Sequence, residues 1–216
     1  MEILGISASG RPEGTVQEAV LAVLEATGRP YDFLSLSGKT ILGCQGCVGC
    51  GATNRCALQD DWTEIGEKML AADAIVFGAP NYYASINALG HACLERTFCF
   101  RHREAFKLAG TLGVAVGVGA GPDRSPVVDF IRKAFTSNLM PLVGTVTAMG
   151  QTQCYTCGFG EDCAAGGVVA RHGFVECIDP DILPPRFAAQ PDAVLQAKKV
   201  GKMLGSILRE REGLSS

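Results

Sequence analysis

The most constraining feature of this 216-residue sequence is an alternation of short apolar runs with amphipathic segments. The apolar runs are about as long as strands, and hardly any polar residue interrupts them. Runs that are apolar on both faces are typical of parallel strands covered by helices on both sides. The pattern therefore predicts an α/β three-layer sandwich around a parallel sheet, with strands at residues 3–7, 31–36, 74–78, 111–117 and 142–149.

Between and after these runs, apolar residues recur three or four positions apart, which is the spacing of a helix with one buried face. Five strand–helix units fit the flavodoxin-like strand order 2-1-3-4-5 better than the longer classical dinucleotide-binding fold. The sequence shows no internal repeat and no linker, so we expect one domain over residues 1–216. The predicted helices cover residues 15–26, 61–72, 86–98, 123–139 and 192–210.

Two segments depart from the alternation, and both carry cysteines. We call residues 38–60 the cysteine loop and residues 150–185 the C-terminal insertion. Long loops without their own secondary structure are uncommon in compact domains and are often functional. We therefore expect these two segments to carry part of the chemistry.

Composition and charge exclude several classes of protein. A formal charge of −3 argues against a broad nucleic-acid-binding surface. The longest apolar stretch, residues 108–121, is interrupted by glycines and is too short to span a membrane. The first residues carry no basic region of the kind that begins a signal peptide. We therefore expect a cytoplasmic protein with neither a nucleic acid nor a membrane as partner.

The first predicted strand runs into a loop of small residues, Ser7 to Thr15, which a helix follows. Small residues let the backbone approach an anion, and the free N–H groups at a helix start bind phosphate. An ordinary strand–helix turn capped by Thr15 is the alternative. The loop matches neither the Walker A pattern nor Gly-x-Gly-x-x-Gly, which disfavours ATP and classical NAD binding.

Two further loops follow the third and fourth predicted strands. Residues 78–85 contain a proline and two tyrosines, which suit a flat and partly apolar ligand. The alternative is a tyrosine pair packed on the next helix. Residues 117–121 form an open glycine-rich loop, which alone could be a flexible turn. Together the three loops should meet at the topological switch point of the sheet, where such folds bind ligands.

At these loops the sequence resembles the NADPH-dependent FMN reductase superfamily. The resemblance covers roughly residues 1–150 and rests on residues 3–15, the Asp60-Asp61 pair opening a helix, residues 74–85, and the helix through Leu89 and Arg96. It implies that the chain binds FMN, with the phosphate at the first loop and the isoalloxazine ring between the other two. The cofactor-binding residues expected on this basis are Ser7, Ser9, Arg11, Gly14, Thr15, Pro80, Asn81, Tyr82, Tyr83, Ser85, Gly119 and Gly121.

The cysteine loop contains the run C-x2-C-x2-C-x5-C, formed by Cys44, Cys47, Cys50 and Cys56. Four thiolates this close in sequence can enclose one cubane cluster. Zinc is a rival, although structural zinc sites usually join two separated cysteine pairs. Free or redox-active cysteines beside the flavin are a third reading. The spacing resembles the compact motif of iron–sulfur flavoproteins, and this resemblance implies a 4Fe–4S cluster beside FMN.

The remaining cysteines carry weaker signals. Cys93 and Cys99 fall on a predicted helix and are expected to be small buried residues. A second group lies in the C-terminal insertion; its spacing could ligate a metal, but free thiols are the favoured reading. This second group consists of Cys154, Cys157, Cys163 and Cys177.

These features together predict an FMN-dependent oxidoreductase that passes electrons between FMN and a 4Fe–4S cluster. A flavin joins two-electron donors to one-electron carriers without a general acid, base or nucleophile, and no such group is identified. The expected partners are a small redox substrate or an electron carrier such as ferredoxin or NAD(P)H, and the resemblance implies a homodimer or homotetramer. A cluster-free NAD(P)H-dependent reductase of FMN or quinone and a non-catalytic redox sensor are the alternatives.

Overall fold

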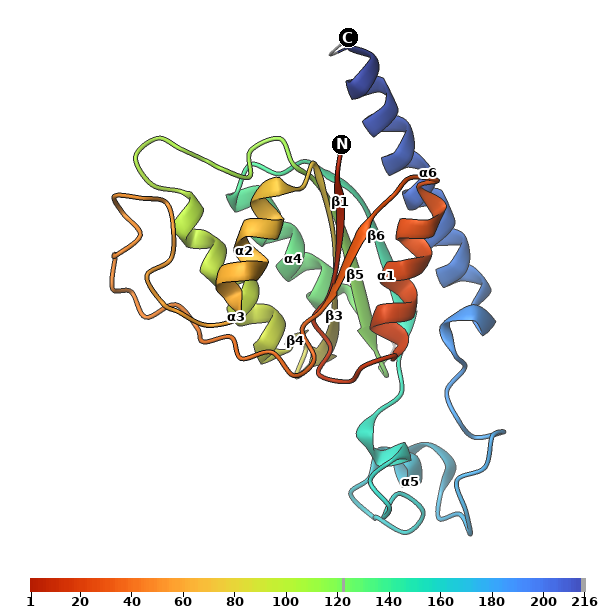
Figure 1. The fold of residues 1–216 in the computed structure, drawn as a ribbon. Helices are drawn as coiled ribbons and strands as arrows, with labels where there is room; N and C mark the ends of the chain where they lie inside the picture. The colour runs from red at the N-terminus through yellow and green to blue at the C-terminus, as the bar shows by residue number, and fades with distance from the viewer. Residues whose placement is uncertain (122, 215–216) are drawn as a thin grey trace.

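The computed structural model describes residues 1–121 and 123–214 and is built around a parallel sheet (Figure 1). The sheet order is β2-β1-β3-β5-β6, and every pair of neighbours along this path is parallel. This confirms the flavodoxin-like order predicted from the sequence. The strands are β1 (Ile3–Ser7), β2 (Asp32–Ser35), β3 (Ala74–Tyr82), β5 (Leu112–Gly119) and β6 (Leu142–Met149).

A sixth, two-residue strand corrects the predicted count of five. This strand, β4 (Ser85–Ile86), pairs antiparallel with the end of β3. β3 consequently runs to Tyr82 instead of ending at Gly78, because its last residues find a partner in β4. Tyr83 and Ala84 form the two-residue turn between them, both with positive φ, 52° and 56°. Such turns normally take Asn-Gly, and Tyr-Ala does not predict a hairpin.

Helices cover both faces of the sheet, as predicted (Figure 1). On one face, α1 and α6 pack over a core built from the alternate residues of β1, β3 and β5. On the other face, the core includes α2, α3 and α4. The helices are α1 (Thr15–Ala26), α2 (Trp62–Ala71), α3 (Ala88–Arg96), α4 (Ser125–Ser137), α5 (Gly167–His172) and α6 (Pro191–Leu214). Short 3-10 turns lie at Thr97–Phe100, Gln153–Tyr155 and Phe187–Ala189.

α6 lies unusually close to α1, and two glycines permit this. A Cβ at Gly201 would lie 2.3 Å from the carbonyl oxygen of Val23, and one at Gly205 would lie 2.3 Å from that of Thr27. Any side chain at either position would therefore force the helices apart. The close contact fixes the long C-terminal helix onto the domain after the chain returns from the C-terminal insertion.

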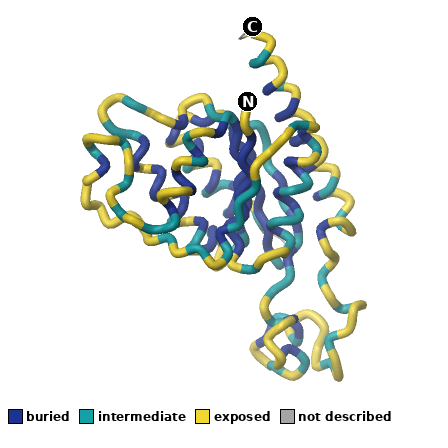
Figure 2. Tube along the Cα trace, in the orientation of Figure 1, coloured by how far each residue is buried: buried dark blue, intermediate teal, exposed yellow. Residues whose placement is uncertain are grey.

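The two cysteine-bearing segments lie outside the three layers. The cysteine loop follows the outer side of α2 and α3, whereas the C-terminal insertion extends beyond the carboxyl ends of the strands (Figure 1). Most of the insertion is exposed or half-buried, in contrast to the sheet (Figure 2). Across the described part of the chain, no helix is both long and apolar enough to cross a membrane.

Candidate functional site

A cavity of about 740 Å³ opens at the carboxyl ends of the strands. Its volume falls within the roughly 300–1,000 Å³ that is usual for small-molecule and cofactor sites. The three loops singled out in the sequence all contribute to its wall. Nine of the twelve residues expected to bind cofactor line it: Ser9, Arg11, Gly14, Thr15, Pro80, Asn81, Tyr82, Tyr83 and Gly119.

The phosphate loop leaves the start of α1 open toward this cavity. Gly14 is the N-cap residue, and no side chain caps the helix there. Thr15 is the first helical residue, so it does not cap the helix in the manner of the alternative reading. The loop is shaped by a bond from the Arg11 N–H to Ser9 Oγ (3.0 Å) and by one from Asn87 Nδ2 to the Ala8 carbonyl (2.7 Å). The uncapped N–H groups can therefore receive an anion.

The β3–β4 hairpin forms the aromatic rim of the cavity. Tyr83 lines the cavity and is nonetheless fully exposed, held outward by the left-handed turn. Positive φ at two successive non-glycine residues is strained, and such strain is found most often at functional sites. Tyr82 is fixed from the other side, because its hydroxyl accepts a hydrogen bond from Gln153 Nε2.

A fourth segment lines the cavity and was not predicted from the sequence. This fourth wall consists of residues 150–153, the first residues of the C-terminal insertion. Arg11 Nη1 donates to the Gln151 carbonyl at 3.5 Å, which joins this wall to the phosphate loop. Thr152 Oγ1 is buried and has no hydrogen-bond partner within the described structure. These residues directly follow β6, so the rule that strand ends carry the site could have found them.

Three expected residues do not line the cavity. Ser7 is the last residue of β1 and is buried beneath the loop that it starts. Ser85 belongs to β4, where it pairs with Tyr82. Gly121 lies beyond the end of β5 and is exposed. The sequence assigned these residues to the correct loops, but in the structure each lies just before or just after the part of its loop that lines the cavity.

The four sulfur-bearing residues of the cysteine loop line one small pocket on the flank of α3, together with Arg96, Phe98 and Cys99. Cys50 is buried, Cys56 is half-buried, and Cys44 and Cys47 are exposed; all four are free thiols. Burial raises the pKa of Cys50, and the nearby sulfurs of the other three raise it further. The loop thus brings the four residues around one space.

A buried ion pair holds the cysteine loop on the domain. The Arg96 guanidinium donates to both carboxylate oxygens of Asp60, at 2.8 and 3.2 Å, and to the Leu42 carbonyl at 2.8 Å. Its Nε lies 3.1 Å from Cys56 Sγ, and its Cζ lies 5.0 Å from the ring centroid of Trp62. Burial alone would raise the pKa of Asp60, but the bonds from Arg96 and from the backbone lower it overall. One side chain therefore ties both ends of the loop to α3.

Further polar contacts fix individual cysteines. The Cys44 N–H donates to Glu95 Oε2 at 2.9 Å. Cys50 Sγ lies 3.0 Å from His102 Nε2, and the His102 N–H donates to Asn54 Oδ1 at 2.8 Å. Neither Glu95 nor His102 was predicted to take part, because no sequence motif connects them to the cysteines. Even so, no group of three or more His, Cys, Asp or Glu side chains in the described residues is arranged to hold a metal ion.

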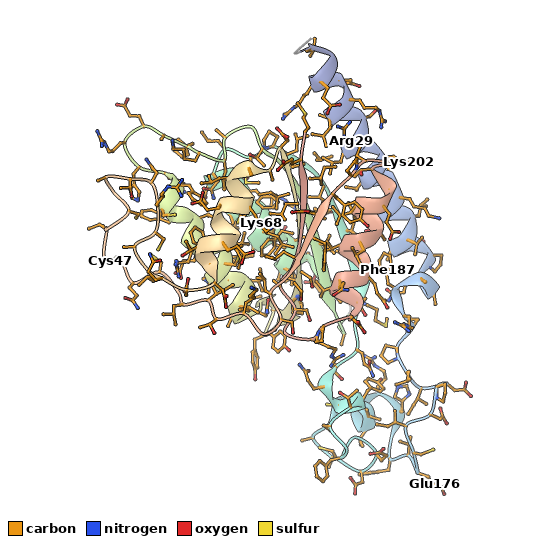
Figure 3. The ribbon with its side chains drawn as sticks, in the orientation of Figure 1. Arg29, Cys47, Lys68, Glu176, Phe187 and Lys202 are labelled. Atoms are coloured by element: carbon orange, nitrogen blue, oxygen red, sulfur yellow. The ribbon has the colours of Figure 1, made fainter. Side chains whose placement is uncertain are left out.

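α3 separates the cavity from the cysteine pocket. Its N-terminal end carries Asn87, which contacts the phosphate loop, and its C-terminal end carries Arg96, which contacts Cys56. A nine-residue helix is about 13 Å long. Cys47 accordingly lies on the outer flank of the molecule, away from the strand ends (Figure 3). Within one chain the phosphate loop and Cys56 therefore contact residues at opposite ends of α3.

The two cysteines of this helical region lie in the core, as the sequence predicted. Cys93 and Cys99 are both buried, and burial raises the pKa of each to about 12. They remain neutral thiols at physiological pH. The Cys93 carbonyl accepts a hydrogen bond from the Trp62 indole at 2.9 Å, which also places that tryptophan in the core.

Comparison with known proteins identifies the class. The profile of the NADPH-dependent FMN reductase family matches residues 1–153, and the chain belongs to this family. It is an FMN-dependent oxidoreductase with a flavodoxin-like fold.

Among curated proteins, the chain is 35% identical over 150 residues to an iron-sulfur flavoprotein of Methanocaldococcus jannaschii, covering 67% of this chain and 76% of that one. It is 34% identical over 122 residues to an iron-sulfur flavoprotein of Methanosarcina thermophila, covering 55% and 63%. Among solved structures, a flavone reductase superposes with a TM-score of 0.61 at 16% identity, covering 98% of this chain and 64% of that one. This last likeness shows the fold.

Proposed function

We propose that the chain binds FMN in the cavity at the strand ends, holds one 4Fe–4S cluster through Cys44, Cys47, Cys50 and Cys56, and works as an electron-transfer flavoprotein. The observation that carries the proposal is the pairing of two features on one domain. One is a cavity with an uncapped helix start, and the other is a pocket lined by four closely spaced cysteines.

The phosphate end of the cavity suits an anion. The open N–H groups of α1 point along a helix dipole that favours negative charge, and Arg11 brings a cation to the same wall. The unpartnered Thr152 hydroxyl offers one further donor. We assign Ser9, Arg11, Gly14 and Thr15 to the phosphate, with Thr152 added from the structure.

The opposite end suits a flat ring. Pro80 and Tyr82 supply apolar surface, Asn81 supplies a polar edge, and the backbone at Gly119 closes the wall. A Cβ at Gly119 would lie 3.0 Å from Asn81 Cβ, so a larger residue would push into this wall. Tyr83 stands at the exposed rim, where it can contact a substrate or a second chain.

The cysteine pocket suits a cluster by its donor set. All four cysteines line one pocket as free thiols, and their spacing is the compact run expected for a cubane. The proteins of Methanocaldococcus and Methanosarcina to which the chain is similar carry the name iron-sulfur flavoprotein. The Arg96 guanidinium beside Cys56 would offset part of the negative charge of four thiolates.

When bound, the flavin supplies two-electron exchange with a donor such as NAD(P)H, and the cluster supplies one-electron exchange with a carrier such as ferredoxin. The chain's own contribution is positional. The phosphate loop anchors one end of the ligand, the β3–β4 hairpin orients the other, and Arg96 keeps the cysteine loop closed. We further propose that residues 1–216 form a single domain that assembles as a dimer or tetramer. The exposed faces of Cys44 and Cys47 would then approach a cavity of a neighbouring chain.

Mass analysis of the cofactor released from the purified protein tests the flavin assignment. We expect FMN, because one phosphate loop is present and the matched family reduces FMN. Recovery of FAD as the tight ligand, or of no flavin after reconstitution, would contradict it. Absence of iron in protein that retains FMN would leave a cluster-free NAD(P)H-dependent reductase as the function, and absence of turnover with any donor would favour a redox sensor.

A further inference from the structure

The C-terminal insertion has too small a core to hold its shape by burial alone. In residues 150–185 only two apolar side chains, Tyr155 and Val168, are buried. Its one α-helix, α5, has six residues, and two large side chains, Phe159 and Phe174, are exposed. Units below about 40 residues usually need disulfides, a metal or a partner to be stable. Four of the ten cysteines lie in this short segment, and all are free thiols.

The backbone brings the stretches that carry these cysteines together. The Val175 N–H donates to the Glu161 carbonyl at 3.1 Å, and Cys163 and Cys177 each follow that contact by two residues. A Cβ at Gly160 would lie 2.1 Å from the Cys154 carbonyl oxygen and 2.8 Å from Ile178 Cδ1. The stretches around residues 154, 160 and 178 therefore meet within one small space.

The first cysteine pair has the local geometry of a metal-binding turn. Cys154 Sγ accepts a hydrogen bond from the Gly167 N–H at 3.1 Å, which holds this sulfur against the start of α5. Cys157 Sγ lies 3.5 Å from the Cys154 carbonyl, so the two residues close one turn. Gly158 follows with φ of +81°, which lets the chain reverse directly after the second cysteine.

We propose that Cys154, Cys157, Cys163 and Cys177 bind one structural Zn²⁺ as a tetrathiolate. Cys154 and Cys157 have the C-x2-C spacing of a structural zinc site, and the Val175–Glu161 backbone bond brings together the stretches that carry Cys163 and Cys177. In the described residues these sulfurs do not form a closed ligand set, so the proposal requires that zinc binding draws them together. Each thiol releases its proton to solvent as its sulfur bonds to the metal, and no electron is transferred.

Zinc binding would also affect the cavity at the carboxyl ends of the strands. Residues 150–153 form its fourth wall, and Cys154 follows them directly. A zinc ion at the root of the insertion would therefore fix the wall that Arg11 and Tyr82 contact. Only this consequence rests on the proposed FMN site; the zinc site itself does not.

Metal analysis of the full-length protein, purified under reducing conditions, tests the proposal. We expect about one zinc per chain in the wild type. The double variant Cys163→Ser/Cys177→Ser should lose it, and the matched control Cys44→Ser/Cys47→Ser should keep it. Zinc retained by the first variant or lost from the control would overturn the assignment. Iron in place of zinc at these cysteines would overturn it equally.

Titration of chelator-treated wild-type protein with Zn²⁺ tests the same site without a variant. A folding defect of a variant therefore cannot explain its result. Zinc should slow proteolytic cleavage within residues 150–185 at least tenfold and leave cleavage elsewhere unchanged. Cleavage that is insensitive to zinc would contradict the proposal. FMN content is measured in the same samples, so that loss of zinc and failure of the FMN site are distinguished.

Discussion

The cysteine loop and the C-terminal insertion are alike in sequence and different in how they are held. Each is long, each carries four cysteines, and neither contains a strand. The cysteine loop is fastened to the domain by a buried ion pair, with Arg96 wholly buried and Asp60 5% exposed. The insertion joins the domain through surface contacts, among them a bond from Arg171 to the Ala120 carbonyl; Arg186, the first residue after it, forms an exposed ion pair with Glu18.

The two segments therefore owe their order to different sources. The domain itself shapes the cysteine loop, so its four cysteines surround one pocket before any cluster is present. The insertion has only two buried apolar side chains, and none of its described residues forms a buried ion pair with the domain, so we propose that a ligand orders its cysteines. The domain thus determines the position of the cysteine loop, whereas the insertion is a segment that metal binding would organise.

Breaking the buried ion pair between Arg96 and Asp60 should have the largest effect on the free energy of unfolding. Arg96→Met leaves the Asp60 carboxylate buried without its partner, and losing one member of such a pair costs about 3–5 kcal/mol. Arg186→Met breaks an exposed pair at the end of the insertion and should cost less than about 1 kcal/mol. Urea unfolding of both variants measures the contrast. Equal losses would show that the two segments are held alike.

The same ion pair predicts a dependence on acid. The pKa of Asp60 is lowered in the folded protein, so its contribution is present above the ordinary aspartate range of about 4 and is lost as pH falls through the lower folded value. The free energy of unfolding should therefore decline more steeply below about pH 4 in the wild type than in Asp60→Asn. Urea midpoints measured across this range check the prediction, and parallel curves for the two proteins would refute it.

Arg11, which contacts the first residues of the insertion, can be tested for a contact with the FMN phosphate. Arg11→Ala should weaken FMN binding by about 1.5–3 kcal/mol and riboflavin binding much less, because a charge-assisted contact to phosphate is lost. Fluorescence titration with both ligands gives the two affinities. An equal loss for FMN and riboflavin would place Arg11 away from the phosphate.

The smallest expected effects lie in the turns of the cysteine loop. Val48 has φ of 49°, which is strained for a β-branched residue, and its side chain is exposed. Val48→Gly should raise the free energy of unfolding by about 0.5–1 kcal/mol, since the relief of strain exceeds the entropy cost of glycine. Gly46→Ala, at φ of 63°, should lower it by about 1 kcal/mol. Thermal unfolding of the pair checks both signs.

The layers of the fold could be predicted because buried parallel strands are apolar on both faces. β3 and β5 are mostly buried, and their continuous apolar sequences are typical of strands covered on both faces. The predicted α1 matches its observed bounds, and α2, α3 and α4 begin or end within about two residues of prediction, the usual uncertainty of helix ends. β4 could not be predicted, because two residues carry no periodicity and the Tyr83-Ala84 turn lacks the usual residues.

The candidate site was only partly predictable, for a related reason. Loops that directly follow strands were found, since topology places strand ends together. The contacts of Arg96 with Asp60 and of His102 with Cys50 join residues 36 and 52 positions apart and follow no local pattern. The fold alone brings them together, so only the structure reveals what holds the cysteine loop closed.

The proposal of a cluster beside an FMN site is tested by the iron, sulfide and FMN content of anaerobically reconstituted protein. We expect about four irons per chain in the wild type. Cys56→Ala should lose this iron and keep FMN, while Cys157→Ala should keep both. Wild-type protein without stoichiometric iron, or iron controlled by Cys157 and not by Cys56, would contradict it.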